Sequence, residues 1–338
     1  MIKNRNLPRA LALVCAVFLA GCAQLGPNYL AAGRPLYNEA VQETDAQQLL
    51  LNIVRQRYND PVLFLDVTNI TSKVTFTVGG NLRANVPLPG TSSIAPELGP
   101  KIEDSPLIFY TPNNGEKFVR QVLTPLDLRT LTLVLQAGWS VERVLLLAGE
   151  SLGGIRNAGA DYRNLASSLR DLQRAGDLTV GLDASSPTLL LTFSSGARDL
   201  PAYQTVCKAL RAACGGEPIQ IRHGLGAAAT GNAPAGLATR SLYSALFFLA
   251  DGVDVPPRDV AAARSRTPAG PDESLFRVRT SATEPPDAAV KVRYRNAWFY
   301  IADTDGDSKV TFALLSMLLT LQAGDTAKVA PLITLPAS

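Results

Sequence analysis

The chain of 338 residues is poor in the side chains that most often carry metal or redox chemistry: it has one histidine, four cysteines and two methionines. A structural or catalytic zinc site needs several Cys or His ligands at suitable spacing, and the single histidine, His223, cannot supply them. We therefore expect no metal site and no cofactor. The sequence also lacks any block of lysines and arginines. Such blocks are the electrostatic footprint of nucleic-acid binding, so we expect no nucleic-acid partner.

Long apolar runs are also missing beyond the N-terminus. After residue 21 no stretch reaches the 18 or so consecutive apolar residues of a membrane-spanning helix. Within the first 21 residues, Lys3, Arg5 and Arg9 precede an apolar segment over residues 10–18, and small residues follow it. This order is typical of a cleaved secretion signal, and the apolar segment is too short to remain as a spanning helix.

The signal ends in Leu19-Ala20-Gly21-Cys22, which resembles the lipobox of bacterial lipoproteins. The resemblance implies that Cys22 Sγ receives a diacylglyceryl group, that the chain is cut before Cys22, and that the new amine is acylated, for example with palmitate. Two or more acyl chains anchor a protein stably. The residue after Cys22 is Ala23 rather than aspartate, which implies the periplasmic face of the outer membrane. The alternative is an ordinary signal peptide with an incidental cysteine.

Removal of residues 1–21 leaves a mature chain of 317 residues, enough for one large domain or two smaller ones. Three basic residues are lost with the signal, so 29 of the 32 remain against 29 acidic residues. The mature chain is therefore formally neutral, and membrane attachment must come from the lipid rather than from a basic patch.

Two cysteines, Cys207 and Cys214, remain after the signal and Cys22 are accounted for. In an oxidising compartment they could form a disulfide. On one unbroken helix a spacing of seven residues would place their Cα atoms about 10.5 Å apart, which is beyond disulfide reach. A disulfide therefore requires the helix to end before Cys214. A disulfide and two free thiols are both compatible with the sequence.

Helical and strand patterns alternate irregularly along the mature chain, without an internal repeat, which predicts an α+β fold of helices and mostly antiparallel sheet. Helices are predicted after a capping box at 44–47 and over 115–123, 124–137, 140–148, 161–175, 200–213, 242–250 and 309–322. Strands are predicted over 62–68, 73–78, 107–111, 178–182, 188–193, 219–222, 276–280, 290–295, 298–302 and 332–335, with a long surface excursion over 81–106.

The composition also suggests where the chain divides. We predict a signal peptide over residues 1–21, a lipid-anchored tether over 22–36, an N-terminal α+β lobe over 37–223, a Gly/Ala-rich loop over 224–239 and a C-terminal α+β lobe over 240–338.

The segment from Gly149 to Gly153 (GESLG) matches the nucleophile elbow of α/β-hydrolases, G-x-S-x-G. In that interpretation Ser151 is the nucleophile, His223 the base, and Asp199 or Asp177 orients the imidazole. The surroundings argue against it, because an elbow follows a strand and here a predicted helix precedes the motif. The alternative, which we favour, is a helix that ends at a Gly-rich turn.

Two further motifs also have structural explanations. Residues 224–229 (GLGAAA) resemble a dinucleotide fingerprint, but Gly231, Pro234 and Gly236 oppose the helix that must follow it. Residues 303–307 (DTDGD) resemble a calcium loop but lack the glycine and glutamate of an EF-hand. We expect a surface loop in the first case and a helix-capping turn in the second.

Several longer stretches together resemble an uncharacterised family of Gram-negative bacterial lipoproteins with no established activity. They are residues 47–58 (QQLLLNIVRQRY), 60–66 (DPVLFLD), 115–125 (GEKFVRQVLTP), 138–144 (GWSVERV), 240–256 (RSLYSALFFLADGVDVP) and 292–322. The resemblance implies location and fold rather than chemistry.

The sequence therefore predicts a lipid-anchored envelope protein, bound to the membrane through Cys22, that contacts an envelope partner protein and is not an enzyme. One alternative is a serine hydrolase that acts on an envelope ester or lipid through Ser151 and His223. Another is a periplasmic carrier of a small ligand or lipid that uses the apolar stripes of helices 242–250 and 309–322.

Overall fold

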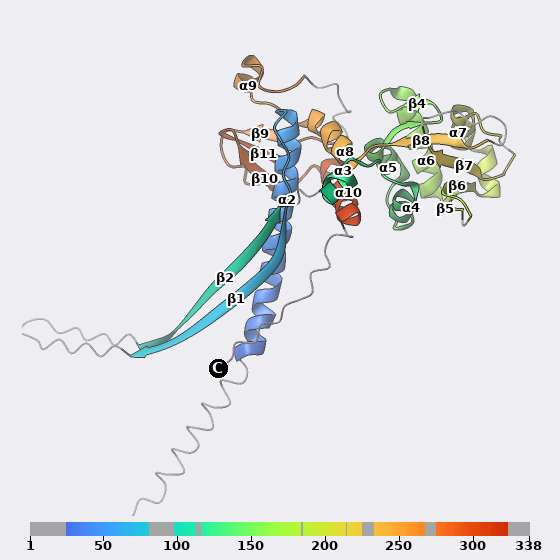
Figure 1. The fold of residues 1–338 in the computed structure, drawn as a ribbon. Coiled ribbons are helices and arrows are strands. Elements are labelled where there is room, and N and C mark those ends of the chain that lie inside the picture. The colour runs from blue at the N-terminus through green and yellow to red at the C-terminus, as the bar shows by residue number, and fades with distance from the viewer. Residues whose placement is uncertain are drawn as a thin grey trace, which may run out of the picture. The chain divides into compact units, whose positions relative to one another are not determined.

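The structure is a computed structural model. It describes residues 25–80, 98–112, 116–183, 185–213, 215–224, 233–267 and 275–323. Two compact units can be distinguished. The first comprises residues 1–62 and 116–326, and the second comprises residues 63–115 and 327–338. Helices and mostly antiparallel sheets make up the described part (Figure 1), so the predicted α+β class is confirmed.

The larger sheet of the first unit has six strands in the order β4-β3-β8-β7-β6-β5. Neighbouring strands are antiparallel except β7 and β8, which are parallel. The strands are β3 (Gly149–Leu152), β4 (Ile155–Arg156), β5 (Leu178–Leu182), β6 (Thr188–Phe193), β7 (Ile219–His223) and β8 (Ala235–Thr239). The strands β5 and β6 have the predicted bounds, 178–182 and 188–193, and pair as an antiparallel hairpin.

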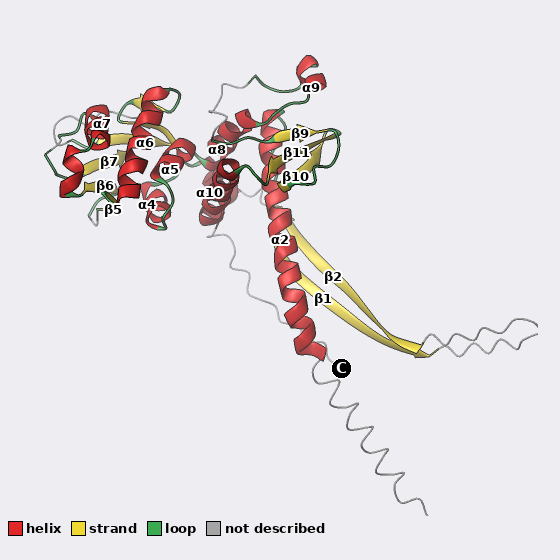
Figure 2. Ribbon diagram, turned by 180° about the vertical axis from the view of Figure 1, so that it is seen from behind, coloured by secondary structure: helices red, strands yellow, loops and turns green. Residues whose placement is uncertain are grey.

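One face of this sheet carries the core. Its residues Leu152, Leu189, Leu191, Ile219, Ile221, Ala235 and Leu237 are buried. Four helices, α4 (Leu128–Gln136), α5 (Val141–Ala148), α6 (Ala160–Ala175) and α7 (Pro201–Leu210), pack against the sheet and against one another (Figure 2). Residues on the opposite face, such as Gln220 and Arg222, are exposed.

The remaining elements of the first unit surround a three-stranded sheet in the order β10-β11-β9. These strands are β9 (Arg279–Ser281), β10 (Ala288–Tyr294) and β11 (Ala297–Ala302), and the helices are α2 (Leu25–Arg57), α3 (Glu116–Leu123), α8 (Leu242–Leu249), α9 (Pro257–Ala261) and α10 (Gly306–Ala323). Arg295 and Asn296, with φ of 46° and 62°, form the β10–β11 turn. Positive φ at both positions is the geometry of a two-residue hairpin. The strands predicted over 290–295 and 298–302 therefore pair as a hairpin, and its turn lies one residue before the 296–297 gap between the two predicted ranges.

Helix α2 differs from the prediction at its start. Residues 25–36 of the predicted tether are helical, and Thr44, the predicted N-cap, lies inside the helix. Thr44 Oγ1 donates to the Ala40 and Val41 carbonyls at 2.9 and 3.0 Å, a bond that threonine forms readily within helices. Pro27 lies in the first turn, where the missing N–H has no intrahelical partner to lose.

Two other helix starts also move. Asp127, rather than Thr124, caps α4 by accepting from Thr130 N at 2.6 Å. Helix α10 begins at Gly306, three residues before the predicted start at 309, and Asp305 caps it by accepting from Ser308 N at 3.0 Å. Aspartate is as good an N-cap as serine or threonine, so spacing alone did not separate the candidates.

The division of the chain also differs from the predicted lobes. Residues 235–239, assigned to the loop over 224–239, form β8, and residues 225–232 lie outside the described part. Helix α2 packs against β10 and α8, which the prediction placed in the other lobe. The predicted strand over 332–335 also lies outside the described residues.

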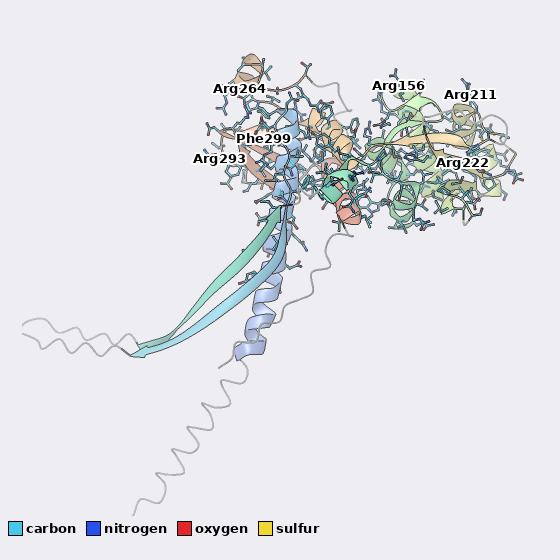
Figure 3. The ribbon with its side chains drawn as sticks, viewed as in Figure 1. Arg156, Arg211, Arg222, Arg264, Arg293 and Phe299 are labelled. Carbon is cyan, nitrogen blue, oxygen red and sulfur yellow. The ribbon has the colours of Figure 1, made fainter. Side chains whose placement is uncertain are left out.

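The C-terminal end of α2 joins the β10–β11 hairpin through aromatic and ionic contacts. Tyr58 packs edge-to-face on Phe299, which is labelled in Figure 3, with ring centroids 6.1 Å apart. Its hydroxyl donates to Asp259 Oδ2 at 3.0 Å, and Arg264 Nη1 donates to Asp259 Oδ1 at 3.0 Å. Asp259 is only 1% exposed, so both contacts satisfy a buried carboxylate.

Asp259 is expected to make stability depend on pH. Burial acts to raise the pKa of Asp259, but the bonds from Tyr58 and Arg264 and the charges of Arg258 and Arg264 outweigh it and hold the pKa below its ordinary value. A carboxyl whose pKa is lower in the folded state stabilises the fold above its unfolded pKa of about 4, and this contribution is lost as the pH falls through the folded pKa.

Asp259→Asn should therefore lower the free energy of unfolding by about 2 kcal/mol at pH 7, with a smaller difference from the wild type below pH 4. Urea unfolding at several pH values measures this. A difference that stays constant down to pH 3 would contradict it.

Helix α7 ends where the disulfide prediction requires. Its last residue is Leu210, and Arg211 takes a left-handed conformation with φ of 53°. Cys207 is buried and disulfide-bonded. Its predicted partner, Cys214, lies outside the described residues, so that pairing stays a prediction.

A Cys207–Cys214 disulfide would close a short loop, and its loss should then lower the free energy of unfolding by about 2 kcal/mol. If Cys214 is the partner, Cys207→Ala, Cys214→Ala and the double variant should all lose the same amount. Thiol labelling of the unfolded protein should require prior reduction, and labelling without reductant would count against the bond.

The second unit contains a two-stranded antiparallel ribbon of β1 (Leu65–Gly80) and β2 (Leu98–Pro112) (Figure 1). The sequence predicted short strands here and a surface excursion over 81–106. Instead β1 joins both predicted strands, and β2 extends back to Leu98. Residues 81–97 lie outside the described part. Among the described residues, no helix has the length and apolar character to cross a membrane.

Candidate functional site

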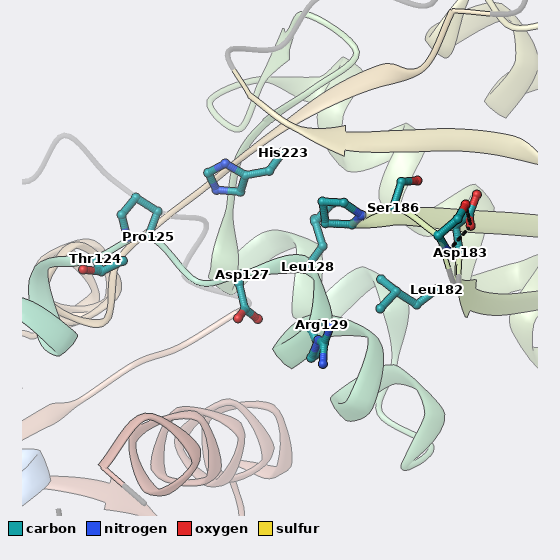
Figure 4. Close-up of a pocket in the computed structure, with 11 residues that line it drawn as sticks. Thr124, Pro125, Asp127, Leu128, Arg129, Leu182, Asp183, Ser186 and His223 are labelled. Atoms are coloured by element: carbon teal, nitrogen blue, oxygen red, sulfur yellow. Dashed lines mark hydrogen bonds between the residues drawn. The ribbon is translucent and has the colours of Figure 1, made fainter. Parts of the chain in front are cut away.

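A cleft of about 560 Å³ opens in the first unit beside the only histidine of the chain (Figure 4). Three segments form it: the start of α4, the β5–β6 turn and the end of β7. Its lining residues are Thr124, Pro125, Asp127, Leu128, Arg129, Leu182, Asp183, Ser185, Ser186, Pro187 and His223. Among them only His223 was predicted from the sequence as a candidate site residue.

The carboxylates of the cleft hold its walls in place. Asp127 caps α4 through Thr130 N. Asp183 Oδ1 accepts from the backbone N and the hydroxyl of Ser185 at 2.8 and 2.7 Å, which closes the turn after β5. The bonds from Ser185 hold the pKa of Asp183 below its ordinary value. Both carboxylates therefore have structural partners.

The hydrogen-bond network of His223 fixes its tautomer. Thr239 Oγ1 donates to the Leu126 carbonyl at 2.6 Å, so its single hydroxyl hydrogen is already used. His223 Nε2, 3.0 Å from Thr239 Oγ1, must therefore be the donor of that bond. In the neutral imidazole this leaves Nδ1 as the acceptor. Base catalysis by Nε2 would require that bond to break.

The structure does not bring Ser151 to His223. Ser151 pairs with Ala238 of β8, whereas His223 pairs with Leu237 on the other side of the same strand. Consecutive residues of a strand point to opposite faces, so Ser151 and His223 lie on opposite faces of the sheet. They are also two strand spacings apart, about 10 Å. A nucleophile and its base need hydrogen-bond reach.

The two glycines of the GESLG motif have structural roles. A Cβ at Gly149 would lie 2.2 Å from the Tyr162 hydroxyl oxygen and 2.7 Å from the Leu145 carbonyl oxygen. Gly153 and its neighbour Gly154, with φ of 59° and 83°, form the tight turn between β3 and β4. The motif is thus a strand and a hairpin turn after a helix, rather than an elbow between a strand and a helix.

The two candidate orienting carboxylates lie elsewhere. Asp177 accepts a bond from the Ser194 hydroxyl, and Asp199 ends the 3₁₀ helix Ser195–Asp199 and is exposed. Both carboxylates lie near the Phe193 end of β6 in the chain and the sheet. His223 lies at the opposite end of β6, because its neighbour Arg222 pairs with Thr188. No triad can form from these residues in this arrangement.

The other motifs resolve in different ways. Cys22 and residues 225–229 of the dinucleotide-like motif lie outside the described part. In the calcium-like loop, Asp305 caps α10, Asp303 accepts from Lys309 Nζ, and Asp307 pairs with Arg143 at 2.6 Å. Among the described residues no group of three or more potential ligands could hold a metal ion.

A cluster that the sequence analysis missed lies at the end of α5. Arg240 Nη1 donates to the carbonyls of Leu146, Leu147 and Gly149 at 3.0, 3.0 and 2.8 Å. Asn157 and Tyr162 donate to carbonyls of the same turn. The last carbonyls of a helix have no intrahelical partner, and these three side chains satisfy them. The only sequence feature that could have indicated this cluster is the position of Arg240 directly after a Gly/Ala-rich stretch.

Comparisons with known proteins add no assignment. No family model, no curated protein and no solved structure matches this chain.

The cleft beside His223 is suited to hydrogen bonding rather than to covalent catalysis. Its serines are already engaged, since Ser185 bonds to Asp183 and Ser186 bonds to Thr188 at 2.8 Å. The apolar part of the lining of this cleft consists of Pro125, Leu128, Leu182 and Pro187.

Proposed function

We propose that this protein is a lipid-anchored protein of the cell envelope, held at the periplasmic face of the outer membrane through Cys22, and that it acts by contact with other protein chains. The anchor is supported by the basic start, the short apolar segment and the Leu-Ala-Gly-Cys sequence of residues 1–22. The formally neutral mature chain supports lipid rather than charge as the source of attachment.

The ribbon β1–β2 is the observation that carries the contact function. Its strands are 16 and 15 residues long, about 50 Å, and no third strand pairs with them among the described residues. Isolated two-stranded ribbons are marginally stable in water, and open edges are templates for pairing with another chain. A ribbon of this length is better suited to a partner than to solvent.

The anchor can be tested by metabolic labelling with an alkyne analogue of palmitate. The wild type should be labelled and remain in the membrane fraction after a salt wash, whereas Cys22→Ala should take up no label. Cys15→Ala, which changes a cysteine removed with the signal, is the matched control and should behave as the wild type. An unlabelled wild type would contradict the anchor.

The contact function needs a second experiment. Crosslinking in intact cells should give a stoichiometric protein adduct through the ribbon. Wild-type protein that is labelled with lipid but yields no adduct would contradict it.

A further inference from the structure

The three-stranded sheet β10-β11-β9 of the first unit has one buried face and one that is polar and aromatic. Phe299 and Val292 lie on the buried face, and Arg293, labelled with Phe299 in Figure 3, lies on the other. Directly opposed residues of a sheet share a face. The register therefore aligns two rows across the outer face: Arg279, Tyr300 and Lys291 in one, and Ser281, Trp298 and Arg293 in the other.

A groove of about 540 Å³ leads from this outer face to helix α2. Helix α2 packs against β10, which is the edge strand of the sheet (Figure 1). Trp298 and Arg293 line the sheet side of the groove, and Thr44, Gln47 and Leu51 line its helix side. These three helix residues are spaced by three and four positions, so they lie along one face of α2. The volume is that of a small-ligand site, roughly 300–1,000 Å³.

The polar lining of the groove offers donors and acceptors together. Glu43 Oε1 accepts from Gln47 Nε2 at 3.0 Å, and Lys291 Nζ pairs with Glu284 Oε1 at 2.7 Å. A carboxylate accepts about four hydrogen bonds and an ammonium group donates three, so both pairs retain capacity for a ligand. With Arg293 included, two carboxylates and two cations line the groove. It is formally neutral.

Arg293 and Trp298 are the most available of the lining groups. Arg293 is exposed and forms no ion pair with another residue in the described part of the chain. Its guanidinium presents five N–H donors in a fixed plane. Trp298 is half-buried, so part of its indole ring forms the wall of the groove.

We propose that this groove binds a glycan, with one pyranose ring stacked on Trp298 and its hydroxyl groups hydrogen-bonded to Glu43, Gln47 and Arg293. This site goes beyond the proposed contact function and involves neither the ribbon nor the lipid anchor.

The chemistry of the groove matches that of a sugar. A pyranose ring has an apolar face of C–H groups, which packs on the electron-rich face of an indole ring. Around its rim are hydroxyl groups, each of which donates and accepts hydrogen bonds. The groove combines one aromatic wall with side chains of both hydrogen-bonding types, and its formal neutrality suits an uncharged ring.

Other occupants fit less well. An apolar peptide side chain needs an apolar pocket, but the aliphatic lining is limited to Leu51, which is half-buried, and Val292, which is 8% exposed. An anionic membrane surface attracts basic segments, whereas Glu43 and Glu284 would oppose it here.

The test is isothermal titration of the full-length, lipidated protein, held in a detergent without a sugar head group. Two probes represent the two envelope sources of pyranose rings. One is soluble chains of N-acetylglucosamine and N-acetylmuramic acid from which the peptides have been removed. The other is the core oligosaccharide released from lipopolysaccharide by mild acid. We expect at least one probe to bind, and the tighter of the two identifies the source.

The stacking contact is tested at Trp298. Trp298→Ala should weaken binding of that probe about tenfold, as expected for loss of an aromatic anchor. Trp298→Phe keeps an aromatic face and should recover part of the affinity. Unchanged affinity in Trp298→Ala would overturn the proposed site.

The hydrogen-bonding side is tested with two matched variants of α2. Gln47→Ala should weaken binding about fivefold, through the loss of a hydrogen bond to the sugar. Gln42 is also a glutamine of α2 that bonds four residues back, to Asn38 at 3.3 Å, but it does not line the groove. Gln42→Ala should therefore bind as the wild type. Alanine preserves the helix in both variants.

Three further results would overturn the proposal. One is the absence of binding of both probes at millimolar concentration. Another is an equal loss of affinity in Gln42→Ala and Gln47→Ala, which would place the effect in the helix rather than in the groove. The third is binding of peptide-bearing wall chains but not of peptide-free ones, which would indicate a peptide ligand. The labelling and crosslinking experiments do not involve this groove, so these results leave the proposed function standing.

Discussion

Replacement of Arg240 by methionine should lower the free energy of unfolding by about 3 kcal/mol, a large part of the stability of an ordinary domain. Arg240 is 8% exposed. Its guanidinium lies 3.8 Å from the centre of the Phe248 ring and donates to three carbonyls at the end of α5. Methionine fills a similar volume but removes the side-chain donor of the Leu147 carbonyl and leaves the Leu146 and Gly149 carbonyls with Asn157 alone. An unsatisfied buried group costs about 1–3 kcal/mol.

The charge of Arg240 also matters. The C-terminal end of a helix carries a partial negative charge that favours a cation. Burial lowers the pKa of the Arg240 guanidinium, yet an arginine stays charged at neutral pH. Arg240→Lys keeps the charge but not the planar group that reaches several carbonyls. We expect the free energy of unfolding of Arg240→Lys to lie between those of the wild type and Arg240→Met.

Urea unfolding of these variants and of two further ones measures the contribution of Arg240. Arg222, on the exposed face of β7, offers the matched control, and Arg222→Met should change the free energy of unfolding by less than about 0.5 kcal/mol. Asn157 shares two acceptors with Arg240. The double variant Arg240→Met/Asn157→Ala should therefore lose more than the sum of the single variants. An additive double variant would contradict the shared cap.

Asp251→Asn should have an effect of similar size, about 3–5 kcal/mol. Asp251 lies between Arg57 and Arg266, and the three side chains are 7%, 8% and 12% exposed. Arg57 Nη1 is 3.8 Å from Asp251 Oδ1, and Arg266 forms a close ion pair with the same carboxylate. Two buried guanidinium groups thus share one carboxylate, and its neutralisation removes the charge that pairs with both.

Groups other than Asp251 compensate little of the charge of the Arg57 guanidinium. Among the described residues its Nε and Nη1 have no hydrogen-bond partner. Burial, together with the charge of Arg266, lowers the pKa of Arg57 despite the opposing effect of Asp251. Asp251 is therefore the main source of compensation for this guanidinium.

Asp254→Asn is the matched control. Asp254 is 38% exposed and pairs with Arg277 at 3.3 Å, so its loss should cost less than about 1 kcal/mol. Asp251→Asn combined with Arg266→Gln should recover part of the loss, because only one guanidinium then remains. Equal effects for Asp251→Asn and Asp254→Asn would contradict the argument.

Local sequence signals were sufficient where the structure itself is local. The hairpin β5–β6 and helix α6 appear almost where alternation and the closing Gly176 placed them, because their pairing partners are close in the chain. Helix α7 ends at Leu210, three residues before the predicted end at 213, and Arg211 in a left-handed conformation follows it.

Elements held by distant parts of the chain were not predictable. The sequence of β8 (AGLAT) is poor in strand-forming residues and has the composition of a loop. It is a strand because β3 and β7 supply partners on both sides, and tertiary pairing overrides a weak propensity. Gly236 also accepts from Gly153 N at 2.9 Å across this sheet.

The candidate site shows the same division. The GESLG motif matched a hydrolase signature in sequence only. Its chemistry requires a histidine within hydrogen-bond reach of Ser151, and the sheet places His223 on the opposite face. Conversely, Arg240 carried no motif, and its acceptors lie about 90 residues earlier. Such a pairing follows from the fold and not from the spacing.

The packing of α2 on β10 has a consequence for the order of folding. The buried stripe of α2, with Leu50 and Ile53, is covered by elements that include residues 242–249 and 288–294. A chain that emerges from its N-terminus must therefore carry this apolar stripe uncovered until more than two hundred further residues have followed. Long-range closure of this kind is slow and exposes intermediates to aggregation. We expect the chain to depend on a holding chaperone before its C-terminal hairpin is complete.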